Sequence, residues 1–441
     1  MRLSRRRLLR TFGTAAGAVL LQNCTSGVPS KRPFQLNPYT IVVANPEVNT
    51  VRLGIIPSLE VAPLLVAQNK QIFAKYGMKN VELVPFKSWQ NICDRTEIGT
   101  DLGNSNAGGN TGIDGGHFYS PCPELLNEGM INRYSRRMAM YVLMRLHTHG
   151  GYILASKRLK TLGMQIGRTT LSAWQDMARL FGKPMRAAIA EQGSNYDLWL
   201  RYWLAALEVT PKQNIDILTI ATEQMLADVK QNRADLLCVD SWHTLKLTEA
   251  GVAEPAIAVA EIWRNYPGEV LAMRADWVDK YPIATQALMQ ATMEAQIWCD
   301  DPANAQELNT ILAMSFKDIR SLISQPTKIF SELFKSIPNQ KTGTLKVDRS
   351  NNPIKYWSSD GISVSYPYKS HDLWFLNEYR RWQKLPDNFE IKETIDAVNR
   401  EDLWKKAAKS IGVPDTHIPE STSRGIETFF DGFQFDPNHI E

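Results

Sequence analysis

Short apolar runs alternate with segments in which apolar residues recur at helical spacing over much of the chain. VRLGIIPS, from Val51, predicts a strand, and VAPLLVAQNKQIFAKYG, from Val61, predicts a helix that Gly77 can close. Further strands are predicted at VELVPF, AMYVLMRL, IDILTI, DLLCVD and AIAVAEIW, and a further helix at EQMLADVKQNRA. This alternation predicts α/β units with a mainly parallel sheet.

The pattern changes near Ala275, where ADWVDKYPIATQALMQATMEAQIWCDD predicts a long amphipathic helical region, and helical patterns dominate afterwards. In the earlier segment LWLRYWLAA, Trp and Tyr recur at helical spacing, so we expect them in the core. A chain of 441 residues is too long for one compact core, which favours two or three domain-sized units.

One stretch interrupts the alternation, TDLGNSNAGGNTGIDGGHFYSP from Thr100. Its Gly and Asn residues favour positive φ, and backbone N–H groups in such a loop can hold an anion. The stretch lacks both the Lys-Ser/Thr of a P-loop and the Gly-x-Gly-x-x-Gly fingerprint, so it gives little support to a nucleotide site. A surface loop without function is an equal alternative.

Residues 1–24 read as an export signal rather than as part of the fold. SRRRLLR, from Ser4, is typical of a twin-arginine signal. The apolar run Thr11–Leu21 is far shorter than the ~20 residues that span a bilayer, and no later stretch is long and apolar enough. Cys24 follows and predicts a lipidation site, with plain cleavage nearby as the alternative. Residues 25–50, rich in Pro, Asn and Ser, predict a tether.

Charge argues against a nucleic-acid partner. Five of the 50 Lys and Arg lie in the first 23 residues, which hold no acid, so 45 basic residues face 46 acidic ones in the remainder. Four further cysteines are widely spaced without a Cys-x-x-Cys pair, which does not indicate zinc. One disulfide would fit an exported protein, but buried thiols are the favoured interpretation for Cys93, Cys122, Cys238 and Cys299.

Several motifs together resemble the nitrate- and bicarbonate-binding lipoproteins of bacterial ABC importers. In chain order they are FAKYGM, KSW, GIDGGHFYSP, YDLWLRYWLAA, MRADWVDK, SYPYKSHDLWFL, VNREDLWKKAA and STSRGIETFFDG. They follow the family's order and cover nearly the whole mature chain, and the last three are long and specific. The twin-arginine start and Cys24 also fit that family.

The resemblance implies an α/β, two-lobed periplasmic binding protein fold of type II, with a central cleft and a hinge. Residues 51–150 and 266–441 would form the first lobe and residues 151–265 the second, and the lobes would close on a ligand. It also implies no enzyme but a carrier of a small inorganic anion, working with ABC permease and ATPase subunits. Its implied place is the periplasmic face of the cytoplasmic membrane, tethered there by lipid.

The resemblance also carries over a set of ligand-binding positions: Trp89, Gly151, Asn195, Tyr196, Val239, Asp240 and Glu269. Trp89 matches a cleft Trp that can pack on a flat anion or donate its N–H. Asn195 and Tyr196 stand where the family has Thr-His, Gly151 where nitrate binders have Gln, and Glu269 where they have Lys. The chain therefore loses a possible cation at Tyr196, loses an amide and opens space at Gly151, and reverses a charge at Glu269.

Glu269 decides which anion is expected. Nitrate only accepts hydrogen bonds, so an ionised carboxylate ~4 Å away would cost roughly 4 kcal/mol at an effective dielectric near 20. Bicarbonate can donate its O–H to the carboxylate; alternatively, calcium can bridge Glu269 and the anion. We therefore expect bicarbonate rather than nitrate, with no cofactor required and calcium as an optional companion at Glu269. The alternative is that Glu269 turns outward to solvent.

Neighbouring polar residues have less specific interpretations. His147 and His149 form a His-x-His where the family tends to have Asn-x-Asn, and polar cleft lining or surface is favoured over a metal site. Asp114 and His117 follow the family pattern and are expected to order their loop rather than contact the ligand.

Other functions remain open. Nitrate, nitrite and cyanate are alternative ligands, and a ligand-sensing regulatory protein without a transport role is an alternative function. Related folds host pyrimidine-precursor synthesis, but the sequence offers no nucleophile–base pair for an enzyme. Permease and ATPase genes beside this gene would favour transport over sensing.

Overall fold

The computed structural model describes residues 45–100, 112–161 without 132 and 134, 185–315 without 213, and 354–439. These residues belong to one compact unit, Phe34–Glu441. The predicted export signal with Cys24, nearly all of the predicted tether and residues 101–111 of the Gly-rich stretch lie outside the described residues.

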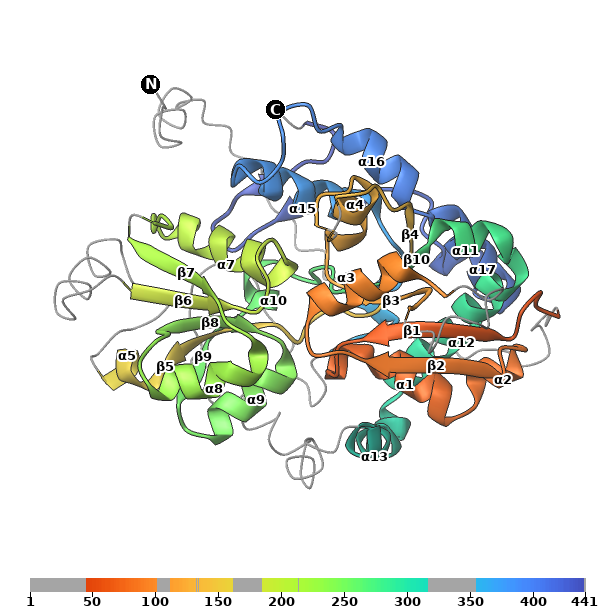
Figure 1. Cartoon of the computed structure of the whole chain (residues 1–441), viewed down its shortest axis with the longest axis horizontal. Coiled ribbons are helices and arrows are strands. Elements are labelled where there is room, and N and C mark those ends of the chain that lie inside the picture. Colours follow the sequence, from red (N-terminus) through yellow and green to blue (C-terminus); the bar gives the residue numbers. More distant parts are fainter. Residues whose placement is uncertain are drawn as a thin grey trace, which may run out of the picture. The chain divides into compact units, whose positions relative to one another are not determined.

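The first sheet has five strands in the order β2-β1-β3-β10-β4 (Figure 1). Their bounds are Thr50–Ile55 for β1, Asn80–Pro85 for β2, Gly115–Phe118 for β3, Met140–Arg145 for β4 and Val270–Arg274 for β10. β1 is parallel to β2 and β3, whereas β10 is antiparallel to both of its neighbours, β3 and β4.

The second sheet also has five strands, in the order β7-β6-β8-β5-β9. Their bounds are Tyr152–Ser156 for β5, Met185–Ile189 for β6, Ile215–Thr219 for β7, Leu236–Val239 for β8 and Ala253–Ala258 for β9. β6 is parallel to β7 and β8, and β5 is antiparallel to β8 and β9.

The α/β class is confirmed, and so is the mainly parallel course of the strands, because four of the five strands in each sheet run in the same direction. In each sheet one strand, β10 or β5, runs against both of its neighbours. These are the strands that the chain enters after passing from one sheet to the other, through residues 146–151 before β5 and residues 263–269 before β10. We call these segments the first crossover (146–151) and the second crossover (263–269).

Helices cover the strands. The N-terminal and middle helices are η3 (Leu59–Val61), α1 (Ala62–Asn69), α2 (Ile72–Lys75), α3 (Trp89–Ile98), α4 (Cys122–Asn127), α5 (Lys157–Thr161), α7 (Asn195–Ala206), α8 (Thr222–Lys230), α9 (Ser241–Glu249) and α10 (Val259–Ile262). The later ones are α11 (Ala275–Lys280), α12 (Pro282–Asp300), η4 (Pro302–Asn304), α13 (Ala305–Ser315), α15 (Lys369–Arg381), α16 (Ile391–Val398), α17 (Glu401–Ser410) and η5 (Asp415–His417). Two short hairpins, β11–β12 (Ser358–Ser359, Ile362–Ser363) and β13–β14 (Glu427–Thr428, Gln434–Phe435), complete the described chain.

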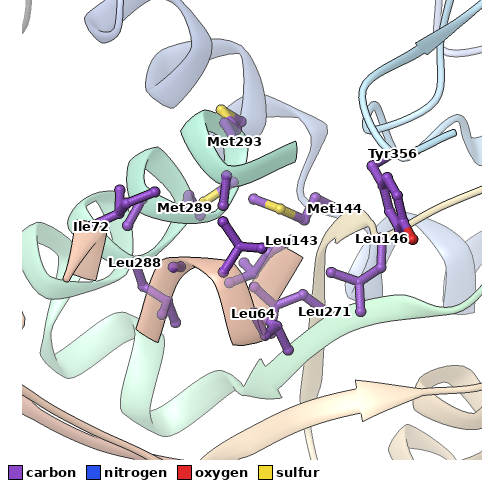
Figure 2. Packing of buried hydrophobic residues seen from close by; sticks show 14 of the residues in the cluster. Leu64, Ile72, Leu143, Met144, Leu146, Leu271, Leu288, Met289, Met293 and Tyr356 are labelled. Atoms are coloured by element: carbon purple, nitrogen blue, oxygen red, sulfur yellow. The ribbon is translucent and has the colours of Figure 1, made fainter. Parts of the chain in front are cut away.

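The long helical region after Ala275 is divided at Tyr281, and Pro282 begins α12. Proline suits that first position because its missing N–H would have no partner there in any helix. Nearly all of the inner face of α12 is buried, and Figure 2 shows Leu288, Met289 and Met293 gathered with side chains of α1, β4 and β10.

A second core lies around α7, where Trp199 and Trp203 are fully buried, as expected for the LWLRYWLAA segment. Trp374 of α15 joins this core, whereas Trp404 of α17 joins the core around α12. The C-terminal segment therefore packs against elements of both sheets.

Candidate functional site

Polar side chains gather where strands of both sheets end. In open α/β sheets, ligands bind outside the carboxyl ends of the parallel strands. The residues at these ends are Glu60 after β1, His117 in β3, Asn195 after β6 and Asp240 after β8. Glu60 and His117 lie close enough to Asp240 and Glu269 for those charges to shift their pKa values.

The two crossovers run side by side at this place. The N–H of Leu146 donates to the carbonyl of Glu269 (2.8 Å), and the N–H of Gly268 donates to the carbonyl of His147 (3.0 Å). The hydroxyl of Thr148 donates to the carbonyl of Tyr266 (2.6 Å). Backbone pairing therefore fixes His147 and Glu269 next to each other, although they are far apart in sequence.

The side chains of His147 and Glu269 form an ion pair, and each residue is only 1% exposed. His147 Nε2 contacts Glu269 Oε2, and His147 Nδ1 lies 3.0 Å from the carbonyl oxygen of His149. A carboxylate and a carbonyl both accept, so a ring that donates from both nitrogens, and therefore carries a positive charge, satisfies these two contacts. The backbone N–H of Glu269 also lies 3.3 Å from His147 Nε2.

The pKa values agree with this charge state. Burial acts against both charges, but it is outweighed by the mutual attraction and hydrogen bond of the pair. The pKa of Glu269 is lowered to about 2, and the pKa of His147 is raised above its usual value. Both shifts favour the ionised form of the pair, which is neutral overall.

This pairing changes the interpretation of both residues. Glu269 does not turn outward to solvent, so that alternative is wrong. His147 is not a surface residue but the counter-charge of Glu269. The repulsion expected between Glu269 and an anion is consequently reduced by the imidazolium beside it.

Asn195, the first residue of α7, is the second partner of Glu269. Its Nδ2 lies 3.3 Å from Glu269 Oε1, and the residue is fully buried. Since the carboxylate only accepts, the amide must direct its NH₂ toward Glu269. Asn195 Oδ1 is then left as a buried acceptor with no hydrogen-bond partner in the described structure.

Two tyrosines fill the position where Gly151 was expected to open space. The N–H of Gly151 donates to Tyr266 Oη (2.6 Å). A Cβ atom at Gly151 would lie 3.1 Å from Tyr266 Oη and 3.3 Å from Tyr196 Cε1. The expectation of open space is therefore wrong: the aromatic rings occupy it. Tyr196 follows Asn195 on α7, is 7% exposed, and has no hydrogen-bond partner for its hydroxyl among the described residues.

Trp89 begins α3 and packs edge-on against His117 and Tyr119, with ring centroids 4.8 Å and 5.4 Å away. His117 Nδ1 accepts the N–H of Ile56 (3.4 Å), so the ring proton resides on Nε2. Burial lowers the pKa of His117 to about 4, which keeps the ring neutral. His117 Nε2 has no partner in the described residues and is thus a buried donor beside Trp89.

Val239 and Asp240 are less available for contact with a ligand than the sequence led us to expect. Val239 is a buried strand residue paired with Tyr152. Asp240 caps α9: Oδ1 accepts the N–H of His243 (2.8 Å), and Oδ2 lies 2.6 Å from His243 Nδ1. The carboxylate of Asp240 is therefore already engaged by the helix that it begins.

Glu60 is a site residue that the sequence interpretation missed. It is 1% exposed, and its Oε1 lies 3.2 Å from the N and 2.8 Å from the Oγ of Ser241, the first residue of α9. Its Oε2 has no partner in the described chain. Burial, followed by the charges of Asp240 and Glu269, raises the pKa of Glu60 to about 7. An acidic residue within the apolar segment SLEVAP was the available signal, the same signal that singled out Glu269.

The surroundings of Glu269 do not suit calcium, which prefers six to eight oxygen ligands. Both carboxylate oxygens face nitrogen donors of His147 and Asn195. Within the described ranges, no group of three or more His, Cys, Asp or Glu is arranged to hold a metal ion. Nor does any helix there combine the length and apolar character needed to cross a membrane.

Comparison with known proteins places these features in context. The sequence model of the NMT1-like family matches residues 44–313. The nitrate/nitrite binding protein NrtA of Synechococcus elongatus is 38% identical over 448 residues, covering 99% of this chain and 96% of the relative. The bicarbonate-binding protein CmpA of the same organism is 37% identical over 450 residues, covering 99% and 96%.

Two further matches are an ATP-binding protein of a transporter and a solved structure. The bicarbonate transport ATP-binding protein CmpC of Synechococcus elongatus is 28% identical over 390 residues, which cover 87% of this chain and 53% of that relative. The crystal structure of the periplasmic nitrate-binding protein NrtA from Synechocystis PCC 6803 superposes with a TM-score of 0.75 at 36% identity, covering 90% of this chain and 97% of that one.

Proposed function

We propose that this chain, which belongs to the NMT1-like family, binds a small inorganic oxyanion outside the cytoplasm. It then delivers the anion to ABC permease and ATPase subunits. The proposal rests on its relation, over nearly its full length, to the solute-binding proteins NrtA and CmpA. The NrtA and CmpA relatives are named as binding proteins.

We propose bicarbonate as the preferred anion. The carrying observation is the neutral His147–Glu269 pair, which stands where nitrate binders are expected to have a lysine. A monoanion therefore meets no net positive charge from this pair. The buried acceptor Asn195 Oδ1 has no partner among the described residues, and it suits a ligand that carries an O–H. Nitrate has no proton to donate and would leave such an acceptor unsatisfied.

Donors for the remaining ligand oxygens stand on other residues at the same strand ends and helix starts. His117 Nε2–H is unpartnered and beside Trp89, and the hydroxyl of Tyr196 has no partner among the described residues. Trp89 offers an aromatic face to a flat anion. Val239 and Asp240 contribute to this proposal only as the end of β8 and the cap of α9.

We further propose that binding requires no calcium. The role foreseen for the cation, to relieve repulsion between Glu269 and the anion, is met by the imidazolium of His147. Calcium bound together with the anion remains the competing arrangement, and it would require the anion to bring most of the oxygen ligands.

Nitrate or nitrite is the second candidate ligand, because the NrtA relatives carry those names and match this chain at least as well as CmpA does. Cyanate would face the same lack of positive charge as nitrate. A sensor without a transport role is the second candidate function, and permease and ATPase genes beside this gene would speak against it.

The proposed place is the periplasmic face of the cytoplasmic membrane, with a lipid on Cys24. This rests on the twin-arginine motif and on the periplasmic NrtA structure. Mass spectrometry of the mature N-terminus should find an acylated Cys24. An unmodified N-terminus at any other residue would refute the anchor while leaving the binding function intact.

Calorimetric titration of the mature protein with bicarbonate, nitrate, nitrite and cyanate, each with and without calcium, tests the proposed function. We expect bicarbonate to bind most tightly and calcium to make no difference. Tighter binding of nitrate than of bicarbonate would contradict the ligand, and no binding of any of the four would favour the sensor.

A further inference from the structure

Two cysteines face each other beside the candidate site. Cys93 lies on α3, Cys122 is the first residue of α4, and their Sγ atoms are 3.5 Å apart. Both are buried, at 2% and 0% exposure. Cys238 and Cys299 are also buried and unpaired, but they belong to the separate cores around α7 and α12. Among the described cysteines, Cys93 and Cys122 alone are recorded in contact with each other.

We propose that Cys93 and Cys122 form a disulfide in the exported protein. A disulfide requires the sulfurs to approach from their present 3.5 Å to about 2.05 Å. Disulfides persist in the periplasm and are rare in the cytoplasm. The proposal of a disulfide therefore rests on the proposed function, which places this protein outside the cytoplasm.

The bond forms by thiol–disulfide exchange with a disulfide oxidant, either a thiol oxidoreductase or oxidised glutathione. The thiolate of one cysteine attacks the oxidant's disulfide, which gives a mixed disulfide and releases one oxidant thiolate. The second cysteine attacks the mixed disulfide and releases the other. The pair loses two electrons and two protons, and the two sulfurs of the oxidant gain them.

Burial sets the rate of this exchange. It raises the pKa of the Cys122 thiol well above its usual value, an effect to which the neighbouring Cys93 adds. The thiolate is the reactive form, so oxidation of the native protein is slow and proceeds when α3 or α4 opens locally.

The bond would tie together two walls of the candidate site. Trp89 precedes Cys93 by about one helical turn, and Tyr119 stands three positions before Cys122. The rings of Trp89 and Tyr119 are already in edge contact, with centroids 5.4 Å apart. We therefore expect reduction to lower the thermal midpoint by roughly 4 °C, from the chain entropy of the closed loop and the size of the protein.

The test uses full-length protein from cells quenched in acid, denatured without reductant and labelled with a maleimide. Mass spectrometry should find Cys238 and Cys299 labelled, and a peptide pair joined through Cys93 and Cys122 that separates on reduction. Cys93→Ser should expose Cys122 to the label, and Cys122→Ser should expose Cys93. Cys238→Ser is the matched buried control and should leave the joined peptides unchanged.

Fractionation of the same cells separates this inference from the proposed function. A periplasmic chain with all four thiols labelled overturns the disulfide and leaves the binding function standing. A chain found in the cytoplasm contradicts the proposed location and leaves the disulfide to be tested separately. For that test the purified protein is incubated with oxidised glutathione. Selective joining of Cys93 to Cys122 once the labelling pattern no longer changes with time supports the geometry, and four labelled thiols at that point overturn it.

Discussion

His147 and Glu269 form a buried ion pair that joins the two segments by which the chain passes between its two sheets. The pair places one positive and one negative charge where the lysine expected in nitrate binders would place a single positive charge. A neutral pair attracts a monoanion weakly, so the ligand must be held by hydrogen bonds, and a ligand that can both donate and accept uses more of the groups present.

Breaking the His147–Glu269 pair from one side should destabilise the protein strongly. Glu269→Gln leaves a buried imidazolium without its counter-charge, and the expected loss is about 3–5 kcal/mol in the free energy of unfolding. The double variant His147→Asn/Glu269→Gln removes both charges and should cost less than the two single variants together. Urea unfolding of the four proteins measures the coupling.

A surface pair supplies the control for that cycle. Lys369 and Asp396 are 2.7 Å apart with side chains 27% and 67% exposed, so their coupling should stay below about 1 kcal/mol. Equal coupling in the two cycles would show that His147 and Glu269 are not the buried pair described.

Glu60 should make stability fall as the pH rises toward neutrality. Burial, then Asp240 and Glu269, raise its pKa to about 7, so the folded protein holds a proton that the unfolded chain has already released. Stability attributed to Glu60 is therefore lost between about pH 4.5 and pH 7 as pH rises. Glu60→Gln cannot ionise, and its free energy of unfolding relative to wild type should increase by roughly 3 kcal/mol across that window.

Urea unfolding at several pH values checks this, with Glu82→Gln as a control of opposite sign. The hydrogen bond from Arg52 lowers the pKa of Glu82, so its contribution is lost as the pH falls. Stability curves of Glu60→Gln and wild type that run parallel would contradict the account of Glu60.

Gly151→Gln alone should not restore a nitrate site. A side chain there would press on Tyr266 and Tyr196, and such overpacking costs about 1–3 kcal/mol. Combining it with Tyr196→His removes one of the obstructing rings and should recover part of the lost stability. Thermal unfolding of the single and double variants measures this, and a Gly151→Gln protein as stable as wild type would show that the rings leave room.

Local patterns in the sequence predicted the α/β class and the buried face of α7, because each depends on residues near one another in the chain. Trp199 and Trp203 are buried as their spacing indicates. The antiparallel courses of β5 and β10 were missed, since they follow from the passage of the chain between sheets rather than from any local period.

The candidate site was predictable only in part for the same reason. The apolar surroundings of Glu269 marked it as unusual, but its partner His147 stands far away in sequence and is brought close by backbone pairing of the crossovers. Glu60 stands in a similarly apolar segment, SLEVAP, but its partner Ser241 is also distant in sequence. The crowding at Gly151 depends on Tyr266, which no sequence spacing connects to that position.

The most direct measurement is the ratio of the affinities for bicarbonate and nitrate, determined by calorimetry in a sealed cell for wild type and for His147→Asn/Glu269→Lys. That double variant replaces the neutral pair with a single buried cation beside Asn195. Wild type should prefer bicarbonate by roughly tenfold or more, and the double variant should shift the preference toward nitrate by at least about tenfold, or ~1.4 kcal/mol. A wild type that prefers nitrate, with a ratio unchanged in the double variant, would contradict the account.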